Sequence, residues 1–144
     1  MDFQGTYEHT LDAKNRLTIP ADHRHRFEGG VVLAQGIEPC VSIWVPQAYD
    51  DFVAETLVGR DRLAPETRKL ARYFSGRSVR TALDSANRVL LTPMLITHAG
   101  LRHEITVCAA LDCLEIWDRA EYETMSAELD AEFPDMTALL GRQG

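Results

Sequence analysis

The feature that most constrains this fold is an internal repeat at half the length of the chain. The pattern L-D-x-x-N-R at Leu11–Arg16 returns at Leu83–Arg88, half of the 144-residue length later. The pattern C-x-x-I-W at Cys40–Trp44 returns in the same order at Cys113–Trp117. Self-similarity at a fixed spacing is the signature of a repeated structural unit. The sequence therefore predicts two diverged copies of one unit.

Each copy shows the same succession of local patterns. Alternating apolar residues predict a short strand just after the shared Asn, then a polar or helical link, two more strands and an amphipathic helix. The strands are expected at 17–19, 31–34 and 41–45, and again at 89–91, 104–109 and 113–117. The links are expected at 21–27 and 93–99, and a further helix between the copies at about 65–75. The apolar faces of the two terminal helices comprise Tyr49, Phe52, Val53 and Leu57 in the first copy, and Tyr122, Met125, Leu129 and Phe133 in the second.

Neither copy can bury a core alone, because three or four strands of about five residues leave one face of a sheet open. We therefore expect a mainly β fold of the α+β class, in which the copies pack as one pseudo-twofold body with helices outside. Two independent domains in tandem are the alternative, and the lack of a Pro/Gly/Ser-rich linker disfavours it. The expected division is a first repeat at 1–59, an inter-repeat helix at 60–76, and a second repeat with a C-terminal helix at 77–144.

Charge is distributed unevenly along the chain. The 15 Lys and Arg against 22 Asp and Glu give a net charge of −7, which argues against a non-specific nucleic-acid coat protein. However, 60–88 holds eight basic and three acidic residues, whereas 112–135 holds nine acidic and one basic. The basic residues Arg68, Lys69 and Arg72 fit either a solvated helix face or a DNA-facing patch. The acidic helix is either solvated away from DNA or meets the basic segment of a neighbouring subunit and so closes a ring.

The repeated loop delivers an arginine to the start of a strand. An Asp at the start of a turn accepts hydrogen bonds from N–H groups two residues on, and Asn tolerates positive φ. Asp12–Asn15 and Asp84–Asn87 are therefore predicted to be tight hairpin turns that position Arg16 and Arg88. Each Asp can simply pair with its own Arg across the turn. An Arg held in this way is also pre-organised for a planar, bidentate target.

These residues resemble the MraZ family of bacterial transcriptional regulators, part of the AbrB-like group of swapped-hairpin β-barrel DNA binders. The resemblance rests on F-x-G-x-Y-x-H-x-L-D-x-K-x-R-L-x-I-P-A at Phe3–Ala21 and on the second D-x-x-x-R at Asp84–Arg88. It implies two AbrB-like repeats that form one pseudo-twofold swapped-hairpin barrel. It also implies a ring-shaped homo-oligomer that represses the promoter of the division and cell-wall gene cluster, its own promoter included.

The resemblance also implies roles for individual residues. Arg16 and Arg88 match the arginines with which the family contacts DNA. Lys14 has no basic counterpart in the second copy, so a phosphate contact is expected of it. Asp12 and Asp84 are expected to support the loops, because a carboxylate facing phosphates would be repelled.

The sequence departs from the family pattern at two places. Asn15 and Asn87 stand where relatives usually carry Gly before the motif Arg, and Asn keeps the left-handed turn accessible. The proline after the strand falls one place later in the second copy, at Pro93, than in the first, at Pro20. This shift puts the exit from the second strand in question, though not the position of Arg88.

Other residue clusters have simpler interpretations. Three cysteines are too few for a disulfide scaffold, and their spacing favours reduced thiols in the core over a zinc site. Trp44 and Trp117 are expected in the core rather than stacked on bases. The chain lacks H-E-x-x-H, G-x-S-x-G, P-loop and G-x-G-x-x-G motifs, so we expect no enzyme, no metal and no cofactor. The residues weighed on this basis are Cys40, Cys108, Cys113, His9, His23, His25, His98, His103, Ser42, Ser75 and Ser78.

No apolar run approaches the roughly 20 residues that a membrane helix needs, and the first residues carry no secretory signal. We therefore expect a cytoplasmic, nucleoid-associated protein. Its expected partners are double-stranded DNA and further copies of itself, with no membrane and no small-molecule substrate. A protein-interaction module without direct DNA binding is the alternative function.

Overall fold

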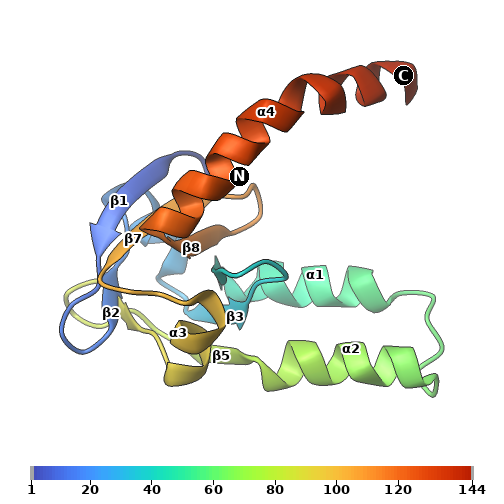
Figure 1. Ribbon diagram of the computed structural model, residues 1–144. Coiled ribbons are helices and arrows are strands. Elements are labelled where there is room, and N and C mark those ends of the chain that lie inside the picture. Colours follow the sequence, from blue (N-terminus) through green and yellow to red (C-terminus); the bar gives the residue numbers. More distant parts are fainter. Residues whose placement is uncertain (1, 144) are drawn as a thin grey trace.

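The structure, a computed structural model, describes residues 2–143, in which eight strands and five helices follow one another (Figure 1). The strands are β1 (Thr6–Thr10), β2 (Arg16–Thr18), β3 (Val31–Gln35), β4 (Val41–Trp44), β5 (Ser78–Thr81), β6 (Arg88–Leu90), β7 (Glu104–Ala109) and β8 (Leu114–Asp118). The helices are the 3-10 helix η1 (Ala21–Phe27) and the α-helices α1 (Pro46–Leu57), α2 (Pro65–Gly76), α3 (Pro93–Ala99) and α4 (Arg119–Gln143).

The two halves of the chain exchange strands. A six-stranded sheet has the order β1-β7-β8-β4-β3-β5, so the first strand of each half pairs with the third strand of the other half. The strands β4 and β8 lie at its centre, where Ser42 faces Glu115. The strands β2 and β6 form a separate antiparallel pair in which Leu17 faces Val89. The strand order is thus symmetric about the β4–β8 pair, as a pseudo-twofold arrangement of the copies requires.

The fold belongs to the mixed α+β class, with an antiparallel sheet. The expectation of a mainly β chain is wrong, because helices hold more residues than strands and α4 alone spans 25 residues. Within residues 2–143 no sheet closes into a barrel, since β1 and β5 are the two free edges of the six-stranded sheet. The swapped-hairpin barrel therefore stays a prediction, as does the division of the chain into three segments.

The main core lies on one face of the six-stranded sheet. Alternation along the strands sends Leu33, Ile43 and Ile116 to this face, where each is fully buried. The β2–β6 pair covers the face with Leu17 and Val89, and η1 and α3 complete the cover. Burying an aliphatic side chain of this kind contributes about 1.5–3 kcal/mol. The core thus fixes the position of the β2–β6 pair, which carries both arginine loops.

The opposite face of the sheet is covered by α1 and by the first turns of α4. Trp44 stacks on Phe52 of α1 and meets the ring of Tyr49 edge to face, with centroids 5.0 and 5.6 Å away. Trp117 packs with Tyr122 and Met125 of α4. Both tryptophans are buried, which confirms the core prediction for them. The prediction of buried, reduced thiols is likewise confirmed for Cys40, Cys108 and Cys113.

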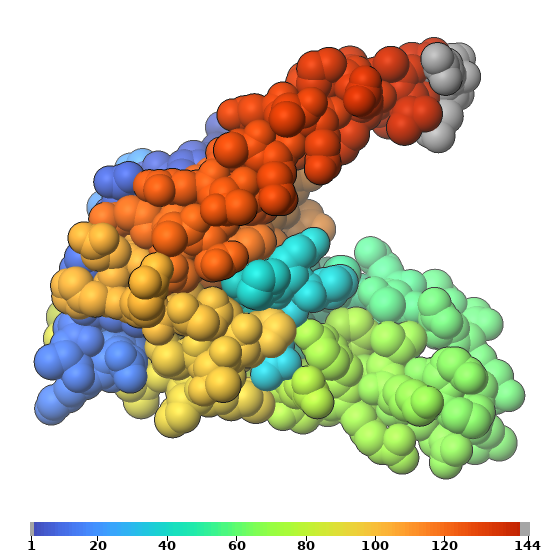
Figure 2. Space-filling view, viewed as in Figure 1, coloured from blue at the N-terminus to red at the C-terminus, as the bar shows by residue number. Residues whose placement is uncertain are grey.

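The second half of α4 leaves the body of the protein (Figures 1 and 2). Leu129 and Phe133 are 47% and 61% exposed, so the predicted apolar face of α4 is covered at Tyr122 and Met125 and open at Leu129 and Phe133. The helix runs past the sheet, and no helix or strand of the described residues lies beneath its later turns (Figure 1). No helix among residues 2–143 combines the length and the apolar character needed to cross a membrane.

Candidate nucleic-acid interface

The first arginine loop is closed by the carboxylate of Asp12. Its Oδ1 accepts hydrogen bonds from the backbone N–H groups of Lys14 and Arg16, both at 2.9 Å. Its Oδ2 accepts a hydrogen bond from Nε of Arg16 at 2.7 Å. One carboxylate therefore both closes the turn and holds the guanidinium beside it.

The second loop repeats this arrangement atom by atom. Oδ1 of Asp84 accepts hydrogen bonds from the N–H groups of Ala86 and Arg88 at 2.9 Å, and its Oδ2 accepts one from Nε of Arg88 at 2.9 Å. The pairing of each Asp with its own Arg is thus present in both copies. Ala86 stands in the second loop where Lys14 stands in the first. This difference leaves the geometry unchanged, because only the backbone N–H at this position takes part.

Each turn also depends on an asparagine in the left-handed region. Asn15 has φ +58° and Asn87 has φ +61°, so both asparagines adopt the left-handed conformation that the sequence predicts for them. The two loops differ from ordinary hairpins in one respect. The strands on either side of each turn belong to different sheets, since β1 lies in the six-stranded sheet and β2 in the two-stranded one.

Replacing Asn15 by Ala should lower the free energy of unfolding by about 1 kcal/mol, because Ala lacks the short polar side chain with which Asn tolerates this φ. Asn15→Gly is the matched control and should cost less, since Gly reaches positive φ freely. Asn87→Ala and Asn87→Gly should behave in the same way. Urea unfolding followed by circular dichroism measures the difference. Equal stability of the Ala and Gly variants would contradict a conformational role for either asparagine.

The β2–β6 pair places both arginines on one outward face. Arg16 stands opposite Leu90, and Thr18 stands opposite Arg88. With a period of two, these four side chains share one face of the ribbon. Leu17 and Val89 point the other way into the core. The two loops also touch, because Nη1 of Arg88 lies 3.7 Å from Oδ2 of Asp12.

The shifted proline leaves the strand exit intact. The N–H of Ile19 donates to the carbonyl of Asn87 at 3.0 Å, and the N–H of Leu91 donates to that of Asn15 at 2.9 Å. These bonds are equivalent, so β2 and β6 leave the ribbon in the same way. The two copies differ only after the ribbon, where the helices begin: Pro20 precedes the 3-10 helix η1, whereas Pro93 is the first residue of α3.

The electrostatics of the loops keep both carboxylates ionised. The backbone N–H of Arg16, above all, lowers the pKa of Asp12 from its usual value of 3.8, and that of Arg88 does the same to the pKa of Asp84. A lowered pKa in the folded state means that the stabilisation is complete above the usual value and is lost as the pH falls through the folded one. At neutral pH, both carboxylates are therefore ionised and keep the hydrogen bonds that close the two loops.

The loops leave the ends of the guanidinium groups for a ligand. Among the residues that the structure describes, neither Nη of Arg16 donates a hydrogen bond, and the side chain is 29% exposed. Lys14 is exposed at the turn, and its ammonium forms no ion pair within 2–143. All seven residues singled out in the sequence thus lie at one ribbon. Thr18 and Leu90 on the same face were missed, although the alternation from each Arg points to them.

Comparison with known proteins gives a consistent picture. A family model described as "MraZ protein, putative antitoxin-like" matches the chain twice, over residues 3–72 and 74–140. A protein of Thermus thermophilus is 34% identical over 142 residues, which cover 97% of this chain and 98% of the relative. A Leifsonia xyli protein is 36% identical over 91% of both chains, and one of Cutibacterium acnes is 31% identical over 93% and 94%. Each is named "Transcriptional regulator MraZ".

Proposed function

Because this chain belongs to the MraZ family, we propose that it is a transcription regulator that binds double-stranded DNA with its paired arginine loops. The observation that carries the proposal is the β2–β6 ribbon, which presents Arg16 and Arg88 on one outward face. The major groove of B-DNA admits a two-stranded β-ribbon. A ribbon with two pre-oriented guanidinium groups on its outer face suits that groove.

The proposed contacts follow from the atoms that remain free. With Nε engaged by Asp12, the two Nη atoms of Arg16 are left to donate to O6 and N7 of a guanine. Arg88, whose Nε is engaged by Asp84, contacts a second base in the same way when its Nη1 exchanges the 3.7 Å ion pair with Asp12 for that base. Lys14 at the tip of the first loop contacts phosphate, which adds affinity without sequence preference. Asp12 and Asp84 stay with their arginines and do not face the DNA backbone.

The same proposal includes a ring-shaped homo-oligomer. Four exposed apolar residues follow one another along the free half of α4 at spacings of four, three and four, and so form a stripe: Leu129, Phe133, Met136 and Leu140. A cleft of about 550 Å³ between α1 and α2 is lined by apolar side chains and by Arg62 and Arg68. The stripe lies on the acidic segment 112–135 and its continuation. The α2 side of the cleft, with Arg62 and Arg68, lies in the basic segment 60–88.

We place the stripe of one copy in the cleft of the next. The fit is supported by apolar character on both surfaces and by their opposite charge. The contact joins two different surfaces, so it is head-to-tail and closes into a ring when the rotation allows. Since one ribbon covers only a short DNA site, several ribbons on one assembly raise the avidity for repeated sites.

The remaining parts of the proposal concern where and on what the protein acts. It represses the promoter of the division and cell-wall gene cluster, which includes its own, in the cytoplasm and at the nucleoid. In this proposal, each of its two repeats is one unit of the swapped-hairpin barrel type. It has no enzymatic activity and needs no small-molecule substrate.

Binding of the full-length protein to DNA from upstream of its own gene tests the function. We expect tighter binding to this DNA than to a shuffled sequence, with affinity falling as salt rises. Lys14→Ala should weaken binding to both DNAs alike and reduce the salt slope by about one, as the loss of one phosphate contact requires. Fluorescence anisotropy over a salt series measures both. A protein that binds neither DNA at low salt would be a protein-interaction module instead.

A further inference from the structure

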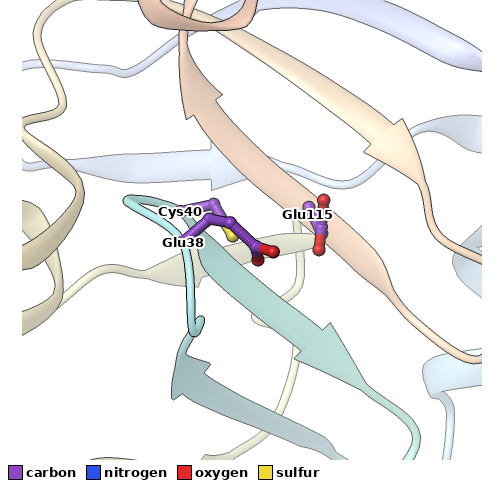
Figure 3. A group of neighbouring side chains, drawn as sticks. All are labelled: Glu38, Cys40 and Glu115. Atoms are coloured by element: carbon purple, nitrogen blue, oxygen red, sulfur yellow. The ribbon is translucent and has the colours of Figure 1, made fainter. Parts of the chain in front are cut away.

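Three side chains on the outer face of the six-stranded sheet converge where β3 turns into β4 (Figure 3). We propose that Glu38, Cys40 and Glu115 bind a zinc ion or another thiophilic divalent cation. The thiol sulfur and one oxygen of each carboxylate lie within 4.8 Å of one another. Thiolate and carboxylate are both ordinary zinc ligands. This site lies outside the arginine loops and does not depend on the proposed function.

The thiol of Cys40 packs in the cluster with Cys108 and Trp117 but has no polar partner within residues 2–143. The residue is fully buried, yet no residue in the described part of the chain forms a hydrogen bond with its sulfur. Figure 3 shows the sulfur on the side of the turn that faces the two carboxylates. A buried, unpartnered sulfur directed at two oxygens is a coordinating arrangement rather than plain packing.

The two carboxylates also lack a counter-charge. Glu38 and Glu115 come within 4.8 Å of each other, and within residues 2–143 neither forms an ion pair with a Lys, Arg or His. Like charges at this distance repel, and a cation between them turns the repulsion into attraction. Glu115 also accepts hydrogen bonds from Nε1 of Trp117 at 3.1 Å and from the thiol of Cys108 at 3.8 Å. These two bonds hold the Glu115 carboxylate in place beside the Cys40 sulfur.

The turn that carries two of the ligands is held from three sides. Within it, Gly36 N–H donates to the carbonyl of Cys40 at 2.9 Å. Nε2 of His98 on α3 donates to the carbonyls of Gly36 and Glu38, at 2.9 and 3.1 Å, and the hydroxyl of Tyr73 on α2 donates to that of Gly36 at 3.0 Å. A Cβ at Gly36 would lie 2.4 Å from the Cys40 sulfur, so only glycine leaves the thiol in this position. The ligands are therefore positioned before any metal arrives.

Coordination requires the thiolate, so binding transfers the Cys40 proton to solvent as the metal–sulfur bond forms. A bound ion would join the β3–β4 turn to β8, beside the cluster of Cys40, Cys108 and Trp117 on which α4 packs.

Zinc binding to the tag-free, full-length protein under reducing conditions tests the site. Competition with a chromophoric chelator should give one zinc per chain. Cadmium, used as the probe for sulfur ligation, should produce a thiolate charge-transfer absorption that Cys40→Ser abolishes. Cys40→Ser and Glu115→Gln should each weaken zinc binding on the order of a hundredfold, as expected for the loss of a ligand or of its close support.

Two further variants separate ligation from folding. Cys113→Ser is the matched control, because Cys113 is an equally buried thiol on the same face of the sheet but outside the group of three. It should bind zinc as the parent protein does. Glu38→Gln changes an exposed side chain, so it should fold normally and still bind zinc more weakly. Absence of zinc binding by the parent protein, or binding that none of the three ligand variants weakens, would overturn the proposal.

Discussion

Replacing Arg16 and Arg88 together by alanine should remove sequence-specific DNA binding. A bidentate contact from Arg to guanine contributes about 1–3 kcal/mol of discrimination. Two such losses correspond to at least roughly thirtyfold weaker binding to the operator. The carboxylates of Asp12 and Asp84, which pair with the arginines in the parent protein, would also lose their counter-charges and make the loops more negative, which weakens binding to DNA further. Anisotropy titrations of operator and shuffled DNA measure the loss.

The matched control replaces both arginines by lysine. Lysine keeps the charge but lacks the planar fork and the Nε–H that bonds to the loop carboxylate. The Lys variant should therefore keep the salt-dependent binding to shuffled DNA and lose the preference for the operator. The alanine variant should stay folded, because Asp12 still accepts hydrogen bonds from two backbone N–H groups. Unchanged operator binding by the folded alanine variant would exclude the loops from recognition.

The geometry of these loops follows from the sequence because the hydrogen bonds that close each turn are local. Asp12 accepts them from residues two and four places on, and Asn15 adopts the left-handed φ that the turn needs. The ion pair between Asp12 and Arg88 joins the two loops but does not close either turn. A five-residue pattern therefore determines the turn wherever it occurs. The links Ala21–Phe27 and Pro93–Ala99 also appear as helices with the expected bounds, because prolines and apolar spacing define them locally.

The strands β1 and β5 were not identified, because their partners lie in the other half of the chain. Thr6–Thr10 is alternately exposed and half-buried, and Ser78–Thr81 is only partly covered. Edge strands of this kind carry little hydrophobic signal, and pairing with β7 and β3 makes them strands. The grouping of Glu38, Cys40 and Glu115 was not predicted from the sequence for the same reason. Glu115 reaches the other two only through the β4–β8 pairing, which joins the halves.

For the apolar stripe of α4, the sequence pattern predicts the helix face correctly, but the surface that covers this face is not found within residues 2–143. The spacing of Leu129 and Phe133 predicts an apolar helix face, and the structure has that face. Nothing within residues 2–143 covers it. An exposed apolar stripe of this length is typical of a surface that meets another protein. This is the reason to assign it to a second copy rather than to the core.

Replacing Leu129 and Phe133 by serine should convert the assembly into monomers. Burying a Leu or Phe side chain contributes about 1.5–3 kcal/mol, and every joint of the ring would lose two of them. The fold should be unaffected, because both side chains are largely exposed in the single chain. Ala54→Glu changes the other surface of the contact, because Ala54 lines the α1–α2 cleft. The larger, charged side chain should prevent the stripe from entering the cleft and so have the same effect. Size-exclusion chromatography with light scattering measures the mass.

Leu111→Ser is the control for the removal of an exposed leucine, since Leu111 is 66% exposed and lies on neither surface. It should leave the assembly intact. The monomeric variants should bind a single short DNA site as the parent does, and a repeated site on the order of a hundredfold more weakly, because avidity is lost. A parent protein that is monomeric in solution, or stripe and cleft variants that both remain assembled, would show that these two surfaces do not join the copies.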